Sequence, residues 1–222
     1  MSSRERILGR VRRALVDVPE DDTPYEQAVP RDYLREHGDL GVERTVDLLA
    51  ENLADYRAIV HRCTAADLAA TIAGMLAARG SKTVVVPTGL DPEWLAQAEA
   101  DLIPDRATST PYELDRIDSV VTACAVAIAE TGTIVLDGGP DQGRRRITLV
   151  PDHHICVVRV PEQVVSSVPQ AMPRLVPSRP LTWISGPSAT SDIELDRVEG
   201  VHGPRTLEVV LVSSPTSAEV TP

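Results

Sequence analysis

The segment Ala129-Glu-Thr-Gly-Thr133 places one carboxylate beside two hydroxyls and a glycine. Gly132 between Thr131 and Thr133 predicts a tight turn whose backbone amides and side-chain oxygens face one point. Glu130 follows a run of apolar residues, where burial would suit a carboxyl group to act as a base or nucleophile. Glu130 is therefore a candidate catalytic residue, and the three residues after it are candidate binding residues. The alternative is a strand–turn–strand with an exposed glutamate.

The segment Gly186-Pro-Ser-Ala-Thr-Ser-Asp-Ile-Glu194 gathers hydroxyls and carboxylates after a Gly-Pro turn. The pattern predicts that a helix begins here, which would present free amides and the positive end of the helix to an anion. It is not a Walker A motif, because the Gly-Lys-Thr/Ser ending is absent. The candidate anion-binding residues are Gly186, Ser188, Thr190 and Asp192. The alternative is that one of them only caps the helix.

His202 lies between small residues in Gly200-Val-His-Gly-Pro204, which leaves its imidazole room to face a cleft. Glu199 or Arg205 nearby would tune its charge state. We treat His202 as a second candidate catalytic residue. The alternative is a histidine that only makes structural hydrogen bonds.

Two further clusters carry weaker signals. The run Asp152-His153-His154 with Cys156 resembles a set of metal ligands, but adjacent histidines on an extended chain point to opposite faces. We therefore predict no metal site. The run 144–146 holds three arginines after a glycine-rich loop, and these can grip a carboxylate or phosphate or else lie on a solvated loop.

Helices and strands alternate along the chain and must position these segments. Apolar spacing predicts helices over 4–16, 41–56, 65–78 (capped by Thr64 and ended by Gly80), after Asp91, and over 161–172. Apolar and β-branched runs predict strands near 58–61, 83–87, 133–136, 155–160, 182–185 and 207–212. Strands that are apolar on both faces are typical of a covered parallel sheet. The predicted fold is a three-layer α/β domain with a mostly parallel sheet flanked by helices.

The chain divides into three predicted parts. Residues 1–40 form an N-terminal helical arm and linker, residues 41–213 the α/β domain, and residues 214–222 a Ser/Thr/Pro-rich tail that we expect to be disordered. The arm contains a basic amphipathic helix. We expect it to dock on its own domain or on a partner chain rather than on a membrane surface.

Composition excludes several classes of protein. The net charge of −11 disfavours a general nucleic-acid binder. No apolar run approaches the roughly 20 residues of a membrane span, and the N-terminus lacks the apolar core of a secretory signal, so we predict a cytoplasmic protein. The three cysteines are far apart, which disfavours a disulfide framework. They are also fewer than the four thiolates that usually hold an iron–sulfur cluster.

Four segments occur together in an order that resembles the LUD domain family: 127–133, 149–155, 186–194 and 200–204. The resemblance covers roughly Asp55 to Val212. Ala189 and Ser191 depart from the family pattern, so no anion contact is expected from the side chain at 189. The resemblance implies a fold similar to the ribose-phosphate isomerase and CoA-transferase group. For the short members, it implies a component of a three-part bacterial system that oxidises L-lactate to pyruvate, with the iron–sulfur clusters on the other two parts.

Three functions follow as hypotheses. The first, which the resemblance favours, is a subunit that binds no cofactor itself and acts through iron–sulfur partner subunits. The second is a free-standing CoA-transferase-like or sugar-phosphate isomerase-like enzyme, with Glu130 as nucleophile or base. In it, the amides of Gly132 and of the loop 186–190 would hold a small carboxylate or other anionic ligand. The third is a small-molecule sensor or scaffold.

Overall fold

The computed structural model describes residues 2–18, 23–30, 32, 34–38, 40–190, 198–199 and 203–213. The chain divides into two compact units, Met1–Tyr33 and Leu34–Pro222. The expected tail 214–222 lies outside the described residues. No helix among the described residues is long and apolar enough to cross a membrane.

The first unit contains the helices α1 (Ser3–Ala14) and α2 (Tyr25–Ala28). A capping box starts α1: the Ser2 hydroxyl accepts from the Glu5 amide, and the Glu5 carboxylate accepts from the Ser2 amide. No residue of α1 is buried, and Ile7 is 60% exposed. The predicted basic amphipathic helix is confirmed. The apolar side chains of Ile7 and Val11 on it are exposed.

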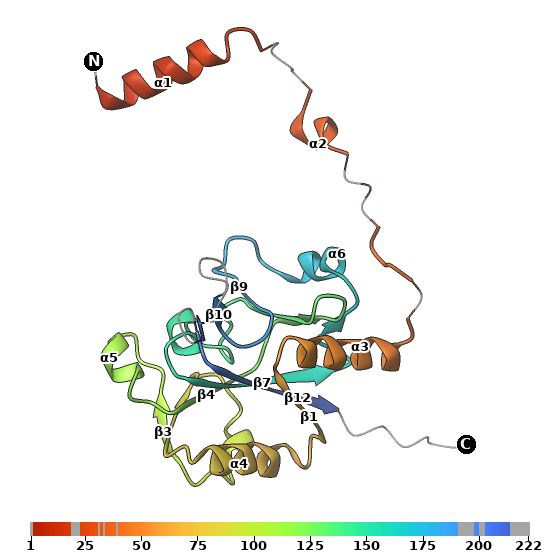
Figure 1. The fold of residues 1–222 in the computed structure, drawn as a ribbon, viewed down its shortest axis with the longest axis vertical. Helices are drawn as coiled ribbons and strands as arrows, with labels where there is room; N and C mark the ends of the chain where they lie inside the picture. Colours follow the sequence, from red (N-terminus) through yellow and green to blue (C-terminus); the bar gives the residue numbers. More distant parts are fainter. Residues whose placement is uncertain are drawn as a thin grey trace. The chain divides into compact units, whose positions relative to one another are not determined.

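The second unit is built on a six-stranded sheet in which every pair of neighbours is parallel (Figure 1). The strand order is β1 (Ile59–Thr64), β12 (Thr206–Ser213), β7 (His153–Val160), β4 (Ser119–Thr122), β2 (Thr83–Val86) and β3 (Asp101–Pro104). All four residues of β4 are buried, as are seven of the eight residues of β7. A parallel sheet covered on both faces requires such continuous apolar strands.

One face of this sheet is covered by α4 (Leu68–Arg79) and η1 (Pro92–Leu95). Ile72 of α4 packs in one core cluster with Ile155 and Val157 of β7. The predicted end of α4 at Gly80 is confirmed by its left-handed conformation, with φ +71°. The predicted cap at Thr64 is wrong. Thr64 is the last residue of β1, paired with Ser213, and its hydroxyl donates to Asp67, which directly precedes the helix.

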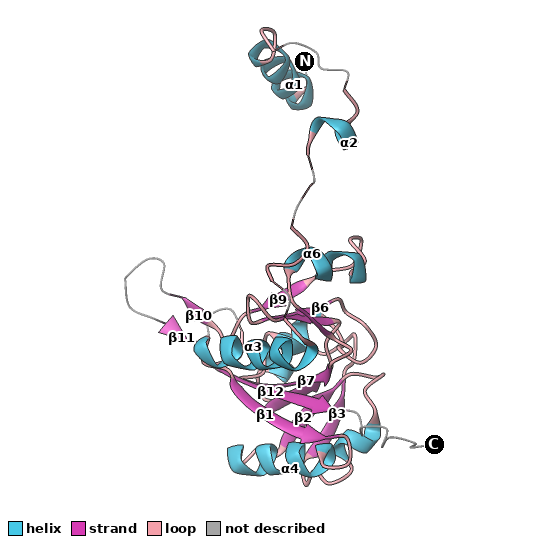
Figure 2. Cartoon of the chain, turned by 90° about the vertical axis from the view of Figure 1, so that its right-hand side faces the viewer, coloured by secondary structure: helices cyan, strands magenta, loops and turns pink. Residues whose placement is uncertain are grey.

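The opposite face carries α3 (Val42–Asp55) and a second sheet of four strands (Figure 2). The order of this sheet is β8 (Val164–Val165), β5 (Val126–Ile128), β6 (Thr133–Leu136) and β9 (Thr182–Ile184). Leu49 and Leu53 of α3 form one core with Ile134 of the small sheet and Leu207 of the large sheet. The short helices α5 (Pro111–Leu114) and η2 (Arg145–Thr148) cover the β2–β4 side of this face. The predicted three-layer α/β fold is confirmed, although one outer layer combines a helix with a sheet.

One predicted helix is wrong. Within 161–172, Val164 and Val165 pair with β5 as a strand, and only α6 (Val168–Ala171) and η3 (Met172–Arg174) are helical. Prolines at 161, 169 and 173 lack the amide donors of a continuous helix, and paired valines favour a strand. The helix expected to begin after the Gly186 turn falls largely on residues 191–197, which lie outside the described residues, and the chain before them forms β10 (Ala189–Thr190). This strand pairs antiparallel with β11 (Val198–Glu199).

Candidate functional site

The turn after Glu130 is fastened to α3. Gly132 has φ +55°, and a Cβ there would lie 2.8 Å from the carbonyl carbon of Asn52. The Asn52 side-chain amide donates to the carbonyl oxygens of Ala129 at 2.8 Å and Glu130 at 3.2 Å. Glycine is therefore required at 132 for two reasons: the positive φ of the turn, and the close approach of the turn to the backbone of α3 at Asn52.

The loop after β9 meets this turn at the end of the same helix. The Thr133 hydroxyl lies 2.8 Å from that of Ser185, and Thr131 donates to Thr133 at 2.8 Å. Gly186 has φ +81°, and a Cβ there would collide with the carbonyl oxygen of Tyr56, the C-cap residue of α3. The structure thus brings the first two predicted segments together.

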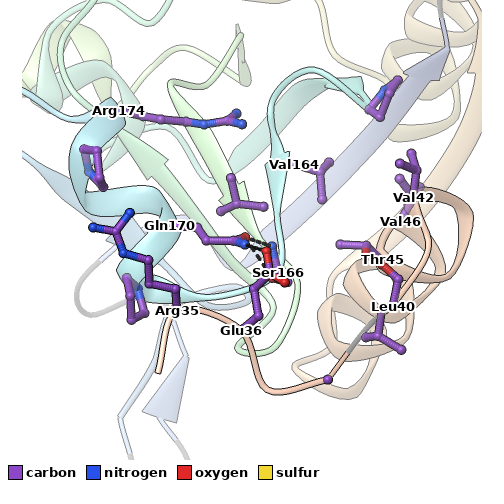
Figure 3. A pocket seen from close by; sticks show the side chains of 15 residues that line it. Arg35, Glu36, Leu40, Val42, Thr45, Val46, Val164, Ser166, Gln170 and Arg174 are labelled. Atoms are coloured by element: carbon purple, nitrogen blue, oxygen red, sulfur yellow. Dashed lines mark hydrogen bonds between the residues drawn. The ribbon is translucent and has the colours of Figure 1, made fainter. Parts of the chain in front are cut away.

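Glu130 itself faces another direction. Its carboxylate lies 3.0 Å from Nδ1 of His37, with side chains 26% and 54% exposed. Its amide donates to the carbonyl oxygen of Ser166, a residue that lines a cavity of about 490 Å³ (Figure 3). Glu130 lines neither this cavity nor the cavities beside the Gly186 loop. Its assignment as a base or nucleophile stays a prediction.

The cavity in Figure 3 has a polar side and an apolar side. The Gln170 side chain accepts from the Ser166 hydroxyl at 2.7 Å and donates to Glu36 at 2.6 Å. The apolar side consists of Leu40, Val42, Val46 and Val164. This cavity lies between the segment 35–46 and the segment 161–174, neither of which the sequence indicated as a site.

A smaller cavity of about 280 Å³ contains the predicted loop Gly186–Ser188 in its wall. The Ser188 amide donates to the carbonyl oxygen of Pro204 at 2.8 Å, which joins the loop to the start of the segment leading into β12. The other lining residues come from η2, β7, β9 and β12 and include Arg145, Thr148, His154, Ile184 and Leu207. The wall is therefore partly cationic, partly polar and partly aliphatic.

A larger cavity, of about 780 Å³, adjoins the 280 Å³ cavity and shares Arg145, Thr148 and Thr182 with it. Its wall includes Thr88 and Asp105, which follow β2 and β3, and the glycine-rich loop 138–143. The larger of the two cavities therefore lies beyond the carboxyl ends of β2 and β3, where α/β sheets usually bind ligands, whereas His154 and Leu207 of the smaller one lie near the amino ends of β7 and β12.

Of the three arginines around these cavities, one is unpaired among the described residues. The Arg144 guanidinium pairs with Asp105, whose hydrogen bonds raise the pKa of Arg144 above its ordinary value. Arg179 lies 2.8 Å from Asp137. The side chain of Arg145 is exposed and makes no hydrogen bond or ion pair with a described residue. Arg145 is thus the guanidinium available to an anionic ligand.

His153 and His154 point to opposite faces of the sheet, as predicted. Nδ1 of His153 lies 2.8 Å from the Ser119 hydroxyl, and its Nε2 lies 3.0 Å from Glu208. Nε2 of His154 lies 2.8 Å from the Thr122 hydroxyl. Within the described part of the chain, no three His, Cys, Asp or Glu side chains gather as metal ligands.

His202 and Asp192 lie outside the described residues, and Thr190 is described only as part of β10. Arg145 was not among the predicted binding residues, although the arginine run after a glycine-rich loop was a signal for it. The sequence indicated His154 only as a possible metal ligand. Its place in the cavity wall could not be predicted, because that place depends on the register of β7 with β12 and β4.

Comparisons with known proteins agree with this architecture. A family profile for the LUD domain matches residues 46–212. The protein named lactate utilization protein C from Deinococcus radiodurans is 49% identical over 166 residues, covering 73% of this chain and 76% of that one. The Geobacillus kaustophilus protein of the same name is 31% identical over 173 residues, covering 68% and 70%. A crystal structure of a DUF162 family protein from Deinococcus radiodurans superposes with a TM-score of 0.67. It is 40% identical and covers 78% of this chain and 99% of that chain.

Proposed function

The chain belongs to the LUD domain family, and from this premise we propose that it is a cytoplasmic component of a bacterial lactate utilization system. In this role it works with iron–sulfur partner subunits in the oxidation of L-lactate to pyruvate and carries no cluster of its own. Support comes from relatives named lactate utilization protein C. The three separated cysteines also support it, because a cluster usually needs four thiolates.

The observation that carries the proposal is that Arg145, which pairs with no described residue, lies beside a cavity of about 280 Å³. This volume is just below the roughly 300–1,000 Å³ of most ligand pockets, so it suits a small molecule. A guanidinium binds a carboxylate through two parallel hydrogen bonds. The cavity therefore fits a short carboxylic acid such as lactate or pyruvate.

Growth of the source bacterium on L-lactate tests this function. Deletion of the gene should abolish growth on L-lactate but not on glucose, and the wild-type gene should restore it. Arg145→Gln should fail to restore growth. Arg146→Gln is the matched control, because Arg146 is the next residue of η2, donates to the Ser109 carbonyl and lines neither cavity. Normal growth of the deletion strain would overturn the proposal.

The partners are tested by affinity purification of the tagged chain from lactate-grown cells. We expect a brown eluate that contains iron and stoichiometric cluster-bearing chains. The purified chain alone should not oxidise L-lactate, whereas the reconstituted mixture should. A colourless, solitary protein whose absence leaves lactate oxidation in cell extracts unchanged would contradict the subunit role.

A further inference from the structure

His154 is a buried histidine of which only one ring nitrogen has a hydrogen-bond partner among the described residues. The residue is only 1% exposed, and Nε2 lies 2.8 Å from the hydroxyl of Thr122. No described residue forms a hydrogen bond with Nδ1. Among the described residues, no fully buried side-chain nitrogen or oxygen lacks a partner, so Nδ1 must be open to the cavity that His154 lines.

The neighbouring hydroxyl decides which nitrogen carries the proton. Thr122 is fully buried. Among the described residues, its hydroxyl has one hydrogen-bond partner, His154. If Nε2 carried the proton, the Thr122 hydroxyl would accept it and its own hydrogen would have no acceptor, which is costly in a buried site. Thr122 therefore donates to Nε2, and the proton of the neutral ring sits on Nδ1.

The ring also stays neutral at physiological pH. Burial, together with the neighbouring His153, lowers the pKa of His154 to about 3. A neutral imidazole in this tautomer presents one N–H donor to the cavity and no acceptor. The ligand atom that it contacts must therefore be an acceptor, such as a carbonyl or carboxylate oxygen.

We propose that Arg145 and His154 form a binding site for a short-chain 2-oxo acid, with the carboxylate on Arg145 and the 2-oxo oxygen on Nδ1 of His154. This assignment rests on the proposed function of the cavity. Both groups of a 2-oxo acid only accept hydrogen bonds, which matches two donors. A 2-hydroxy acid also has a hydroxyl proton that needs an acceptor. Ile184 and Leu207 in the same wall provide apolar contact for a short aliphatic tail.

The test measures binding to the purified full-length chain by calorimetry, with pyruvate, L-lactate, acetate and inorganic phosphate as probes. Pyruvate should bind about tenfold more tightly than acetate, since it gains one hydrogen bond to a buried donor. It should also bind more tightly than L-lactate and phosphate. Equal binding of pyruvate and acetate, tighter binding of phosphate, or no binding of pyruvate would each overturn the assignment.

Variants separate the two donors. Arg145→Gln should lose both pyruvate and acetate, His154→Gln should lose only the preference for pyruvate over acetate, and the control Arg146→Gln should bind as wild type. Because His154→Gln changes a buried site, the wild-type chain provides a second readout by ¹⁵N NMR. One imidazole should carry its proton on Nδ1 from pH 8 to pH 5, and its signals should move with pyruvate but not with acetate. An Nε2-protonated His154 would overturn the assignment.

The failure of this inference is distinguishable from failure of the proposed function. A chain that supports growth on L-lactate but does not prefer pyruvate keeps its role in lactate utilization and loses the 2-oxo acid site. A chain that prefers pyruvate but is not needed for growth on L-lactate keeps the site and loses the role.

Discussion

Nε2 of His153 lies 3.0 Å from Oε1 of Glu208, and Oε2 of the same carboxylate lies 2.6 Å from Nε2 of His61. The chain of hydrogen bonds continues from His153 to Ser119 at 2.8 Å and from Ser119 to Ser81 at 2.6 Å. It crosses β1, β12, β7 and β4 on the face covered by α4, away from the cavity that His154 lines. Because every member has a partner, the network can be buried at low cost and favours one register of the strands.

Glu208→Gln should destabilise the fold by about 1–3 kcal/mol at pH 7. The hydrogen bond from His153 is the strongest influence and lowers the pKa of Glu208, against the opposing effect of burial. The folded state therefore binds fewer protons than the unfolded state just below the ordinary pKa of 4.5. The stabilisation by the Glu208 carboxylate is therefore fully present above pH 4.5. It is lost as the pH falls through the pKa that Glu208 has in the folded state.

Urea unfolding at pH 7 and pH 3.5 measures this effect. The difference between wild type and Glu208→Gln should shrink at the lower pH. Glu51→Gln is the control, because Glu51 pairs with Arg44 on the exposed side of α3 and should matter much less. An equal loss at both pH values would mean that the carboxylate charge is not what stabilises the strands.

His154 gives the unfolding free energy a second dependence on pH. Its folded pKa of about 3 lies below its ordinary value of 6.5, so between these values the unfolded chain takes up a proton that the folded chain refuses. Above pH 6.5 His154 does not lower the unfolding free energy. Between pH 6.5 and pH 3 the unfolding free energy falls as the pH falls, by up to about 1.4 kcal/mol for each pH unit. Chemical unfolding of wild type and His154→Gln between pH 7 and pH 5 checks this. The variant should have the shallower slope, and parallel slopes would contradict the prediction.

The sequence predicted the parallel sheet and its covering helices because these depend on local patterns. The run Thr83–Val86 is apolar on both faces, and Gly80 ends α4 in the left-handed conformation. Such features are determined within a few residues. The four-stranded sheet was not predicted, because Val164 and Val165 form a strand only by pairing with β5, nearly forty residues earlier.

The site was predicted in part for the same reason. Thr133 of the first predicted segment lies beside Ser185, the residue that directly precedes the second. The cavity wall could not be predicted, because Arg145, His154 and Leu207 come from three elements whose relative placement is set by tertiary packing. Charge alone did not separate Arg145 from its neighbours, since Asp105 pairs with Arg144 across the fold.

Gly186→Ala should destabilise the domain by about 1–3 kcal/mol. Alanine is strained at φ +81°, and its Cβ would collide with the carbonyl oxygen of Tyr56. Gly74→Ala is the matched control, because Gly74 lies inside α4 with open space around a new Cβ. There alanine should stabilise by about 0.5–1 kcal/mol. Thermal unfolding of both variants measures this, and a neutral Gly186→Ala would show that the loop is free to move off α3.

Glu130→Gln and Ser188→Ala should leave the fold nearly as stable as wild type while testing the two predicted functional segments separately. Among the described residues the carboxylate of Glu130 pairs only with His37, which is more than half exposed, and such ion pairs contribute about 0–1 kcal/mol. Any loss of growth on L-lactate in a folded Glu130→Gln variant would therefore reflect chemistry rather than unfolding. Ser188 lines the cavity with Arg145, so Ser188→Ala should weaken binding of pyruvate by calorimetry, whereas Glu130→Gln should not. If Glu130→Gln weakened binding of pyruvate as much as Ser188→Ala does, the placement of Glu130 outside this cavity would be wrong.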